Sequence, residues 1–425
     1  MWLIRWNPAD NTVVSRRRNY CSIVTDVDVA VVGAGPAGTA AAIELAREGH
    51  TVTIVDKATF PRDKVCGDGL TADALRSLEA LGLDPTDIPS WAAIDDIECH
   101  GPSGKSVRLQ LPTENGIFAA VARRRHLDAA LVERARAEGA EVIEGHAVTG
   151  VTAGGTHTMV SVGSVAQIRA RHVIAADGMW SPVRKMIGRA TPNYRGEWHA
   201  ARQYFTGVTE QASRQLSVWF EADLLPGYAW SFPLGDGAVN VGFGVLRTPQ
   251  LRGSDMNRVW RDLPERPAIR RLLGSSAQPE GTQRSWPIPA RVGQLPLAAG
   301  NVLFVGDAAG VTDPMTGEGI GQALNTGSLA AHAIMTSDQP HRAGAHYRQL
   351  VTRSLVSDHR LARGLSAVLS RPIGVQAALR MIDLSPWTRD NFARWLFEDY
   401  PRAILLTPRR WRRPLLSGAG AYRPE

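Results

Sequence analysis

The chain has 425 residues, of which 44% are hydrophobic and 21% are charged. This composition is typical of a folded chain with two or three cooperating domains, and it excludes intrinsic disorder and a fibrous repeat. Gly, Pro, Asp or Arg interrupts every apolar stretch before it reaches the roughly 18 residues that a membrane-spanning helix requires.

The net charge of +7 is concentrated at the two ends of the chain. Residues 1–22 carry four Arg and one Asp, and residues 401–425 carry six Arg and one Glu, which leaves a net charge of −1 between them. A nearly neutral body argues against a nucleic-acid interface. The basic ends also contain Trp6 and Trp411, so they either contact anionic lipid headgroups or form solvated chain ends.

Residues 1–25 are expected to form a flexible extension. Arg5 and Asp10 stand where a signal peptide would need an unbroken apolar stretch, which argues against secretion. The cysteines are odd in number and share no metal-ligand spacing: Cys21, Cys66 and Cys99. The eleven histidines form no helical ligand pair, so no metal is expected, and the cysteine usage predicts a cytoplasmic protein.

A strand, a Gly-rich turn and a helix are predicted near the start of the body. The apolar run at 27–33 is followed by a GxGxxG turn, and an Ala/Leu-rich segment then ends at Gly49. The turn consists of Gly33, Ala34, Gly35, Pro36, Ala37 and Gly38. Its first glycine permits the tight turn, its second lets a pyrophosphate approach the backbone, and its third lets the helix pack closely on the strand.

The next predicted strand, 51–56, ends in Asp56, where a carboxylate can accept hydrogen bonds from an adenosine ribose. FAD and NAD share this half, so the unit predicts a dinucleotide without choosing between them. A later strand, 302–307, ends in Gly306 and Asp307, and an apolar helix opens after Gly317. Its N-terminal amides are expected to face the N1/O2 edge of a flavin and to stabilise the anionic reduced form, which favours FAD.

A separate antiparallel sheet is predicted from alternating, aromatic and β-branched segments at 215–221, 228–233 and 238–246. Three aromatic residues of this sheet are spaced by two and therefore share one face: Tyr228, Trp230 and Phe232. They either line an apolar pocket suited to a long hydrocarbon or form the core of the sheet. The turn at 102–105 predicts a hairpin of the same domain.

Together with VIAADG at 173–178, these motifs resemble the FAD-dependent oxidoreductases of the para-hydroxybenzoate hydroxylase fold group over residues 27–340. The stretches PRDKVCGDGL at 61–70 and PGYAWSFPLGDGAVNVGFG at 226–244 are similar to the geranylgeranyl reductase family. That family includes archaeal prenyl-lipid reductases and actinobacterial menaquinone reductases that saturate an isoprenoid double bond.

The resemblance implies a mixed α/β fold, α+β overall. A Rossmann-like FAD-binding domain is expected from residues 26–80, 117–185 and 285–340, and a substrate-binding antiparallel-sheet domain from 81–116 and 186–284. Residues 341–425 are expected to be a helical C-terminal region with a basic tail. Short helices are predicted there between prolines, packed on the substrate side or forming a ramp that faces a membrane.

The resemblance also implies the residues of the site. The cofactor-binding residues are Gly33, Ala34, Gly35, Pro36, Ala37, Gly38, Asp56, Cys66, Gly67, Arg124, Val148, Asp177, Gly306, Asp307, Pro314, Gly317, Gly319 and Ile320. The substrate-binding residues are Tyr228, Trp230 and Phe232. Cys66 is a candidate either for proton transfer or for active-site packing.

The implied function is the reduction of carbon-carbon double bonds in a prenyl lipid or a menaquinone side chain, by hydride transfer from reduced FAD. No second GxGxxG unit marks an NAD(P)H domain, so the electron donor is NAD(P)H bound transiently or a ferredoxin-like protein. The partners implied are an isoprenoid lipid and an anionic membrane at the inner face of the cell, without nucleic acid. The alternatives are a monooxygenase of the same fold acting on an apolar or aromatic substrate, then a flavin halogenase, and a flavin-binding protein without turnover.

Overall fold

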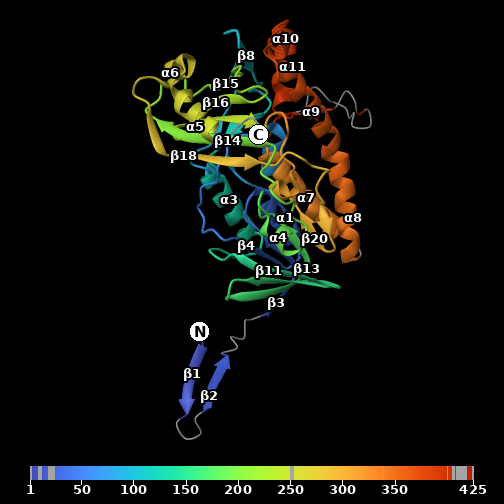
Figure 1. Ribbon diagram of the computed structural model, residues 1–425. Coiled ribbons are helices and arrows are strands. Elements are labelled where there is room, and N and C mark those ends of the chain that lie inside the picture. The colour runs from blue at the N-terminus through green and yellow to red at the C-terminus, as the bar shows by residue number, and fades with distance from the viewer. Residues whose placement is uncertain are drawn as a thin grey trace.

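The computed structural model describes residues 24–248, 253–337, 339–399, 401–403, 407 and 419–423, together with the backbone of two N-terminal strands. Those strands, β1 (Trp2–Asn7) and β2 (Thr12–Arg17), pair antiparallel within the predicted extension (Figure 1). The other residues before Val24, and Trp411 in the basic tail, lie outside the described residues.

The first large sheet is built around two long, buried strands. Strands β10 (Glu141–Ile143), β4 (Val52–Val55), β3 (Val24–Val32) and β13 (Ala166–Ala175) lie side by side and run parallel. The C-terminal half of β13 pairs in parallel with β20 (Val302–Phe304), which the short strand β19 (Ala298–Ala299) flanks. This parallel arrangement brings the carboxyl ends of β3, β4, β13 and β20 to one edge, where a dinucleotide is expected.

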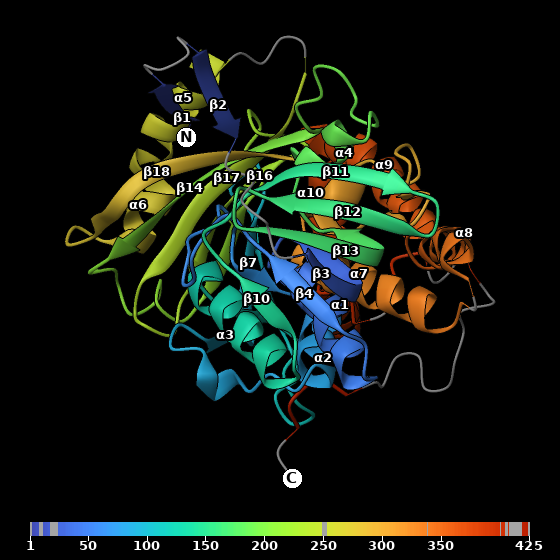
Figure 2. The ribbon, with the colours of Figure 1, turned by 90° about the horizontal axis from the view of Figure 1, so that it is seen from below.

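The N-terminal half of β13 continues the same sheet in antiparallel fashion. It pairs with β12 (His157–Val162), which pairs with β11 (Val148–Gly154). Helix α1 (Pro36–Arg47) packs on α3 (Arg124–Ala137) and on α7 (Ile320–Met335), and α7 also contacts α2 (Ala72–Ala80) (Figure 2). The short helix α4 (Pro182–Met186) contacts β11.

The second large sheet has seven strands in the order β18-β14-β17-β16-β15-β7-β8. Their bounds are Gln278–Ile288, Trp198–Thr206, Val239–Leu246, Tyr228–Pro233, Leu216–Trp219, Asp96–His100 and Ser106–Gln110. The predicted antiparallel pairing of β15, β16 and β17 is confirmed, as is the hairpin of β7 and β8. The pairing of β15 with β7 is parallel, which joins the hairpin to the rest of the sheet.

Helices cover this sheet through two separate apolar cores. Helices α5 (Gly253–Asp262) and α6 (Pro267–Leu273) contribute to one core with β14, β16 and β17, whereas α10 (Pro372–Ile382) and α11 (Pro386–Leu396) contribute to another with β7 and β8. A small sheet pairs β9 (Ala120–Val121) with β5 (Gly69–Leu70) and β6 (Ala92–Ala93), and its strands precede and follow the β7–β8 hairpin in the sequence.

The helical C-terminal segment is confirmed. Helix α8 (Pro340–Val351) continues through a π-helical turn (Thr352–Val356) into α9 (Ser357–Leu369), and prolines then begin α10 and α11. Proline is favoured at the first position of a helix because an amide hydrogen there would have no partner within the helix, so its absence costs nothing. Short 3₁₀ turns span Pro85–Asp87, Leu263–Glu265 and Gly306–Ala309. None of the described helices combines the length and the apolar character needed to cross a membrane.

Candidate active site

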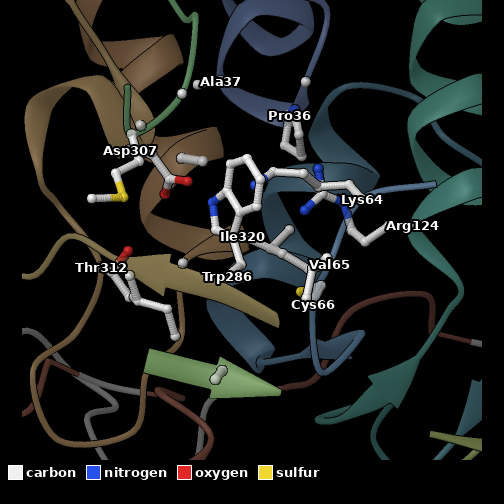
Figure 3. Close-up of a pocket in the computed structure, with 18 of the residues that line it drawn as sticks. Pro36, Ala37, Lys64, Val65, Cys66, Arg124, Trp286, Asp307, Thr312 and Ile320 are labelled. Carbon is white, nitrogen blue, oxygen red and sulfur yellow. The ribbon is translucent and has the colours of Figure 1, made fainter. Parts of the chain in front are cut away.

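A cavity of about 540 Å³ lies between the two large sheets. Its wall runs from the Gly-rich turn after β3, past the segment 61–70, to the aromatic face of β16, so it joins both regions that the sequence predicts to be functional. Figure 3 shows Asp307 and Thr312 on one side of it and Lys64, Cys66 and Arg124 on the other. The volume lies within the range of small-molecule and cofactor sites.

The Gly-rich turn is constrained by close backbone packing. Gly33 has φ +105°, and a Cβ atom there would lie 2.3 Å from the carbonyl oxygen of Ala176. A Cβ atom at Gly38 would lie 2.0 Å from the carbonyl oxygen of Gly33. At Gly35 the nearest atom is the Arg62 guanidinium, 3.7 Å from such a Cβ. The first and third glycines are therefore needed for packing, and the second leaves the backbone open to a phosphate.

Asp56 is held at the end of β4 by two backbone amides. Its Oδ2 accepts a hydrogen bond from the Ala34 amide and its Oδ1 from the Ala58 amide, both at 2.8 Å. The carboxylate is thus fixed beside the Gly-rich turn and lines the cavity, where an adenosine ribose is expected.

Two arginines share one buried carboxylate on the adjacent wall. Arg124 donates two hydrogen bonds to Asp128, at 2.7 and 2.8 Å, and Arg62 forms an ion pair with the same carboxylate at 2.8 Å. Asp128 is fully buried, whereas both arginines line the cavity. Two guanidiniums against one carboxylate leave a positive wall that suits a pyrophosphate.

The opposite end of the cavity contains Asp307 and the start of α7. Gly306 and Gly317 have positive φ angles of 57° and 72°, which permit the turns around Asp307 and before α7. The α7 amides are predicted to face the flavin, but Glu318 Oε1 accepts hydrogen bonds from two of them, Ile320 N at 2.8 Å and Gly321 N at 2.9 Å. A side chain of the motif itself therefore caps this helix terminus, and the sequence prediction missed it.

A buried polar network joins the segment 61–70 to the aromatic strand. Asn240 of β17 donates hydrogen bonds to the Cys66 carbonyl at 2.9 Å and to Asp68 Oδ2 at 2.8 Å, and it accepts one from Trp230 Nε1 at 3.1 Å. Tyr204 donates to the same Asp68 oxygen at 2.7 Å. Asp68 has φ +68° and is fully buried. These contacts fix the Cys66–Asp68 backbone against the second sheet.

Burial controls the acid–base properties of this segment. It raises the pKa of the Cys66 thiol to about 11, so the thiol keeps its proton at neutral pH. Burial also raises the pKa of Asp68 to about 6, although the hydrogen bonds from Tyr204 and Asn240 oppose the change. Cys66 is thus protonated and beside the cavity, but it is a weak acid there.

The predicted sharing of one face by the three aromatic residues is confirmed. The ring centroids of Tyr228 and Trp230, and those of Trp230 and Phe232, are each 5.9 Å apart. All three side chains line the cavity. The hydroxyl of Tyr228 also donates a short hydrogen bond to the Thr316 carbonyl, in the loop before α7. The rings therefore form a continuous apolar wall beside Cys66 and Gly67.

Two further side chains of the cavity were missed by the sequence analysis. Lys64 extends over the Trp286 ring with its Nζ 4.0 Å from the centroid, and burial lowers the pKa of this amine. The Trp286 indole projects into the centre of the cavity in Figure 3. Its Nε1 is buried and has no hydrogen-bond partner among the described residues. Lys64 lies within the segment PRDKVCGDGL at 61–70, but a lysine there does not by itself indicate a position in the cavity.

Most of the predicted cofactor residues line the cavity, but three do not. Ala34 is turned toward Asp56 through its amide, Gly38 packs on Gly33 beneath the turn, and Pro314 accepts a hydrogen bond from Ser366 at its carbonyl, away from the wall. These three residues position the loops around the cavity. Val148 and Asp177 do line it. Val148 is the first residue of β11, not the end of a strand as predicted, and Asp177 follows the end of β13.

Residues 26–337 match a family model described as an FAD binding domain. The menaquinone reductase of Mycolicibacterium smegmatis is 33% identical over 372 residues, covering 82% of this chain and 86% of that protein. Digeranylgeranylglycerophospholipid reductase 1 of Methanothermobacter thermautotrophicus is 30% identical over 351 residues, covering 77% and 83%. The chain belongs to the geranylgeranyl reductase family of FAD-dependent oxidoreductases.

Solved structures agree on the fold of this flavoprotein. A geranylgeranyl bacteriochlorophyll reductase-like protein from Thermoplasma acidophilum superposes with a TM-score of 0.76 at 22% identity, covering 92% of this chain and all of that one. The flavin-dependent brominase Bmp2 superposes with a TM-score of 0.68 at 20% identity, covering 91% and 100%. The fold thus hosts several flavin chemistries, and the cavity must distinguish them.

The residues present fit FAD. The glycine turn has no room for side chains at its packed positions, and Asp56 would accept hydrogen bonds from the ribose. Arg62 and Arg124, which share one carboxylate, would face the pyrophosphate. Asp307 lines the other end, where it would bind the ribityl chain. When bound, reduced FAD supplies a hydride, and the chain's own residues orient the substrate and exclude water.

Proposed function

We propose that this flavoprotein reduces carbon-carbon double bonds of an isoprenoid chain, in a prenyl lipid or a menaquinone side chain. The observation that carries the proposal is the wall of Tyr228, Trp230 and Phe232, which lies in the same cavity as the cofactor-binding elements and directly beside Cys66 and Gly67. Such a wall suits a hydrocarbon that offers no polar group for recognition. The names of the relatives, menaquinone reductase and digeranylgeranylglycerophospholipid reductase, support the same substrate class.

The test is an anaerobic single turnover. The FAD-loaded protein is reduced and mixed with menaquinone or a geranylgeranyl lipid, and flavin absorbance and product mass are followed. Flavin reoxidation with a gain of two hydrogens per alkene supports the reductase. Reoxidation only after oxygen is admitted, with a gain of one oxygen in the substrate, would make the protein a monooxygenase instead. Reduction by NADH, by NADPH or by a ferredoxin in parallel identifies the electron donor.

The substrate class also suggests how the protein reaches its substrate. Five large apolar side chains are exposed on the α9–α11 surface, defined here as Val368, Ile373, Met381, Leu384 and Trp387. Ile373, Leu384 and Trp387 are each at least 65% exposed. Exposed arginines without an ion pair among the described residues flank them: Arg360, Arg363, Arg371 and Arg380. Apolar side chains bordered by free cations complement a bilayer with anionic headgroups.

Peripheral binding of the α9–α11 surface is therefore part of the proposal. Ile373→Ser combined with Leu384→Ser should reduce co-sedimentation with phosphatidylglycerol vesicles, whereas Val165→Ser, an exposed apolar residue of the other domain, should not. Binding that persists in the double variant and is lost on removal of residues 408–425 would assign membrane contact to the basic tail. Equal binding by all variants would refute both surfaces.

A further inference from the structure

A buried cluster of carboxylates lies behind the loop that precedes α7. Asp313 and Glu398 contact the side chain of Arg402, which is 4% exposed, and Glu318 lies near enough to interact with its charge. The Arg402 guanidinium contacts Asp313 Oδ2 and Glu398 Oε1, each at 3.2 Å. Three carboxylates against one guanidinium cannot all be charged at low cost in a buried site, so the cluster retains a proton. Among the described residues, no cluster of His, Cys, Asp or Glu side chains is arranged to hold a metal ion.

The hydrogen bonds show which carboxylates are compensated. Asp313 Oδ1 accepts bonds from the amides of Met315 and Thr316 and from the Thr316 hydroxyl, at 2.8 to 3.0 Å, in addition to its ion pair. Glu398 accepts from Arg402, from Gln322 at 2.9 Å and from Thr71 at 3.2 Å. Glu318 has only the two α7 amides, both on Oε1, and no ion pair among the described residues.

Glu318 is also the member of the cluster that lines the cavity. The charge of Glu318 contributes to raising the pKa of the Cys66 thiol and that of the Tyr228 phenol. All three groups line the same end of the cavity, next to the aromatic wall. The remaining charged groups lie behind it: Asp313 and Arg402, then Glu398, with Asp73 of α2 and His359 of α9 beyond. A carboxyl with one free oxygen thus faces the space where the hydrocarbon is proposed to lie.

We propose that Glu318 is the general acid of the double-bond reduction. One alkene carbon accepts the hydride of the reduced flavin, and the neighbouring carbon accepts the carboxyl proton of Glu318. The π bond breaks, two C–H bonds form, the alkene gains two electrons and the flavin is oxidised. The Glu318 carboxylate then recovers its proton from solvent after product release. This inference takes its substrate, the isoprenoid alkene, from the proposed function. The protonation of the Glu318 carboxyl does not depend on that function.

The electrostatics of the cluster support this role. Burial raises the pKa of Glu318 to about 7, with a further contribution from the charge of Asp313, against the opposing effects of its two amide bonds and of Arg402. By contrast, burial raises the pKa of Cys66 to about 11 and that of Tyr228 still higher. A general acid is most effective when its pKa lies near the working pH, which favours the carboxyl over the thiol and the phenol.

The test compares Glu318→Gln with the wild type. The amide keeps an acceptor for the α7 amides but carries no transferable proton. FAD affinity and reduction of the flavin by dithionite should stay unchanged, whereas flavin reoxidation by the alkene should slow by about a hundredfold or more. In the wild type this rate should fall as pH rises through about 7, and the fall should disappear in the variant. An unchanged rate or an unchanged pH profile would overturn the proposal while leaving the reductase assignment intact.

A second measurement does not require turnover. The infrared difference spectrum of wild type minus Glu318→Gln, both loaded with FAD at pH 6, should show a protonated-carboxyl band that titrates near pH 7. Asp68 and Glu398, whose pKa values burial raises to about 6 and about 8, are present in both proteins and cancel. The matched control is Glu44→Gln, which removes a partly buried carboxyl of α1 away from the cavity and should leave the band in place. If the band is the same in Glu318→Gln and the wild type, Glu318 holds no proton and is not the acid, whatever the substrate proves to be.

Discussion

The two ends of the cavity hold their functional groups in different ways. At the dinucleotide end, Gly33, Gly35 and Asp56 lie within one βαβ unit. Asp56 accepts hydrogen bonds from two backbone amides near it, and Gly33 packs against the backbone of Ala176, just after β13. At the flavin and substrate end, Cys66 and Asp68 are held by side chains from distant segments, Asn240 and Tyr204. The first arrangement depends on close packing of the backbone. The second depends on a buried hydrogen-bond network whose donors and acceptors find their partners only when the second sheet is assembled.

The largest effect is expected from breaking the backbone packing of the dinucleotide end. Gly33→Ala should cost about 4 kcal/mol or more and abolish FAD retention, because its Cβ would lie 2.3 Å from a backbone oxygen. Gly139→Ala is the matched control, since Gly139 has a similar φ of +99° with no atom within 4 Å of the added Cβ, and it should cost only about 1 kcal/mol. Thermal unfolding and flavin content measure both. Equal losses would show that φ strain alone, and not close packing, explains the glycine.

A smaller effect is expected from breaking the network at the substrate end. Asn240→Leu should lower the free energy of unfolding by about 3 kcal/mol, because Asp68 Oδ2, the Cys66 carbonyl and Trp230 Nε1 each lose a buried partner. Denaturant titration measures the loss. Trp230→Phe removes only one donor and should cost about 1 kcal/mol. If the two variants cost the same, Asn240 does not join the Cys66 segment to the sheet.

The pH dependence of stability tests the burial of Asp68. Its pKa of about 6 in the folded protein exceeds the ordinary value of 3.8, so the folded state holds the proton more tightly than the unfolded chain. The associated stabilisation is therefore present below pH 4 and is lost as pH rises through 6. Asp68→Asn should remove about 2 kcal/mol of this dependence between pH 4 and 7. The same change in stability with pH for the variant and the wild type across that range would contradict the raised pKa of the buried Asp68 carboxyl.

The smallest effect compares two bidentate arginine pairs. Arg124→Lys should weaken FAD binding by roughly tenfold, about 1.5 kcal/mol, because lysine cannot form both bonds to Asp128 while facing the pyrophosphate. Arg169→Lys is the matched control, since Arg169 forms the same bidentate pair with Asp26 at 2.6 and 2.8 Å but on the exposed surface. It should change neither affinity nor stability measurably. Isothermal titration of each apoprotein variant with FAD measures the two affinities.

The sequence by itself determined the elements whose signals are local. The strand, glycine turn and helix at 27–49, the carboxylate of Asp56 and the alternation of Tyr228, Trp230 and Phe232 all follow from short-range periodicity and turn chemistry. The helix that opens after Gly317 and the proline-started helices of the C-terminal segment were predictable for the same reason. The shared adenosine half leaves the cofactor open; the Gly306-Asp307 motif with the helix after Gly317 favoured FAD, and the family match agrees.

Only the tertiary structure decided which polar side chains matter around Cys66. Asn240 is separated from Cys66 by 174 residues, and Glu398 and Arg402 reach the loop before α7 from beyond α11. Nothing in the sequence near Glu318 shows that Arg402 is already shared by Asp313 and Glu398 and leaves that carboxyl without a counter-ion. A pKa depends on burial and on every charge within a few ångströms, so it becomes defined only when distant segments pack together.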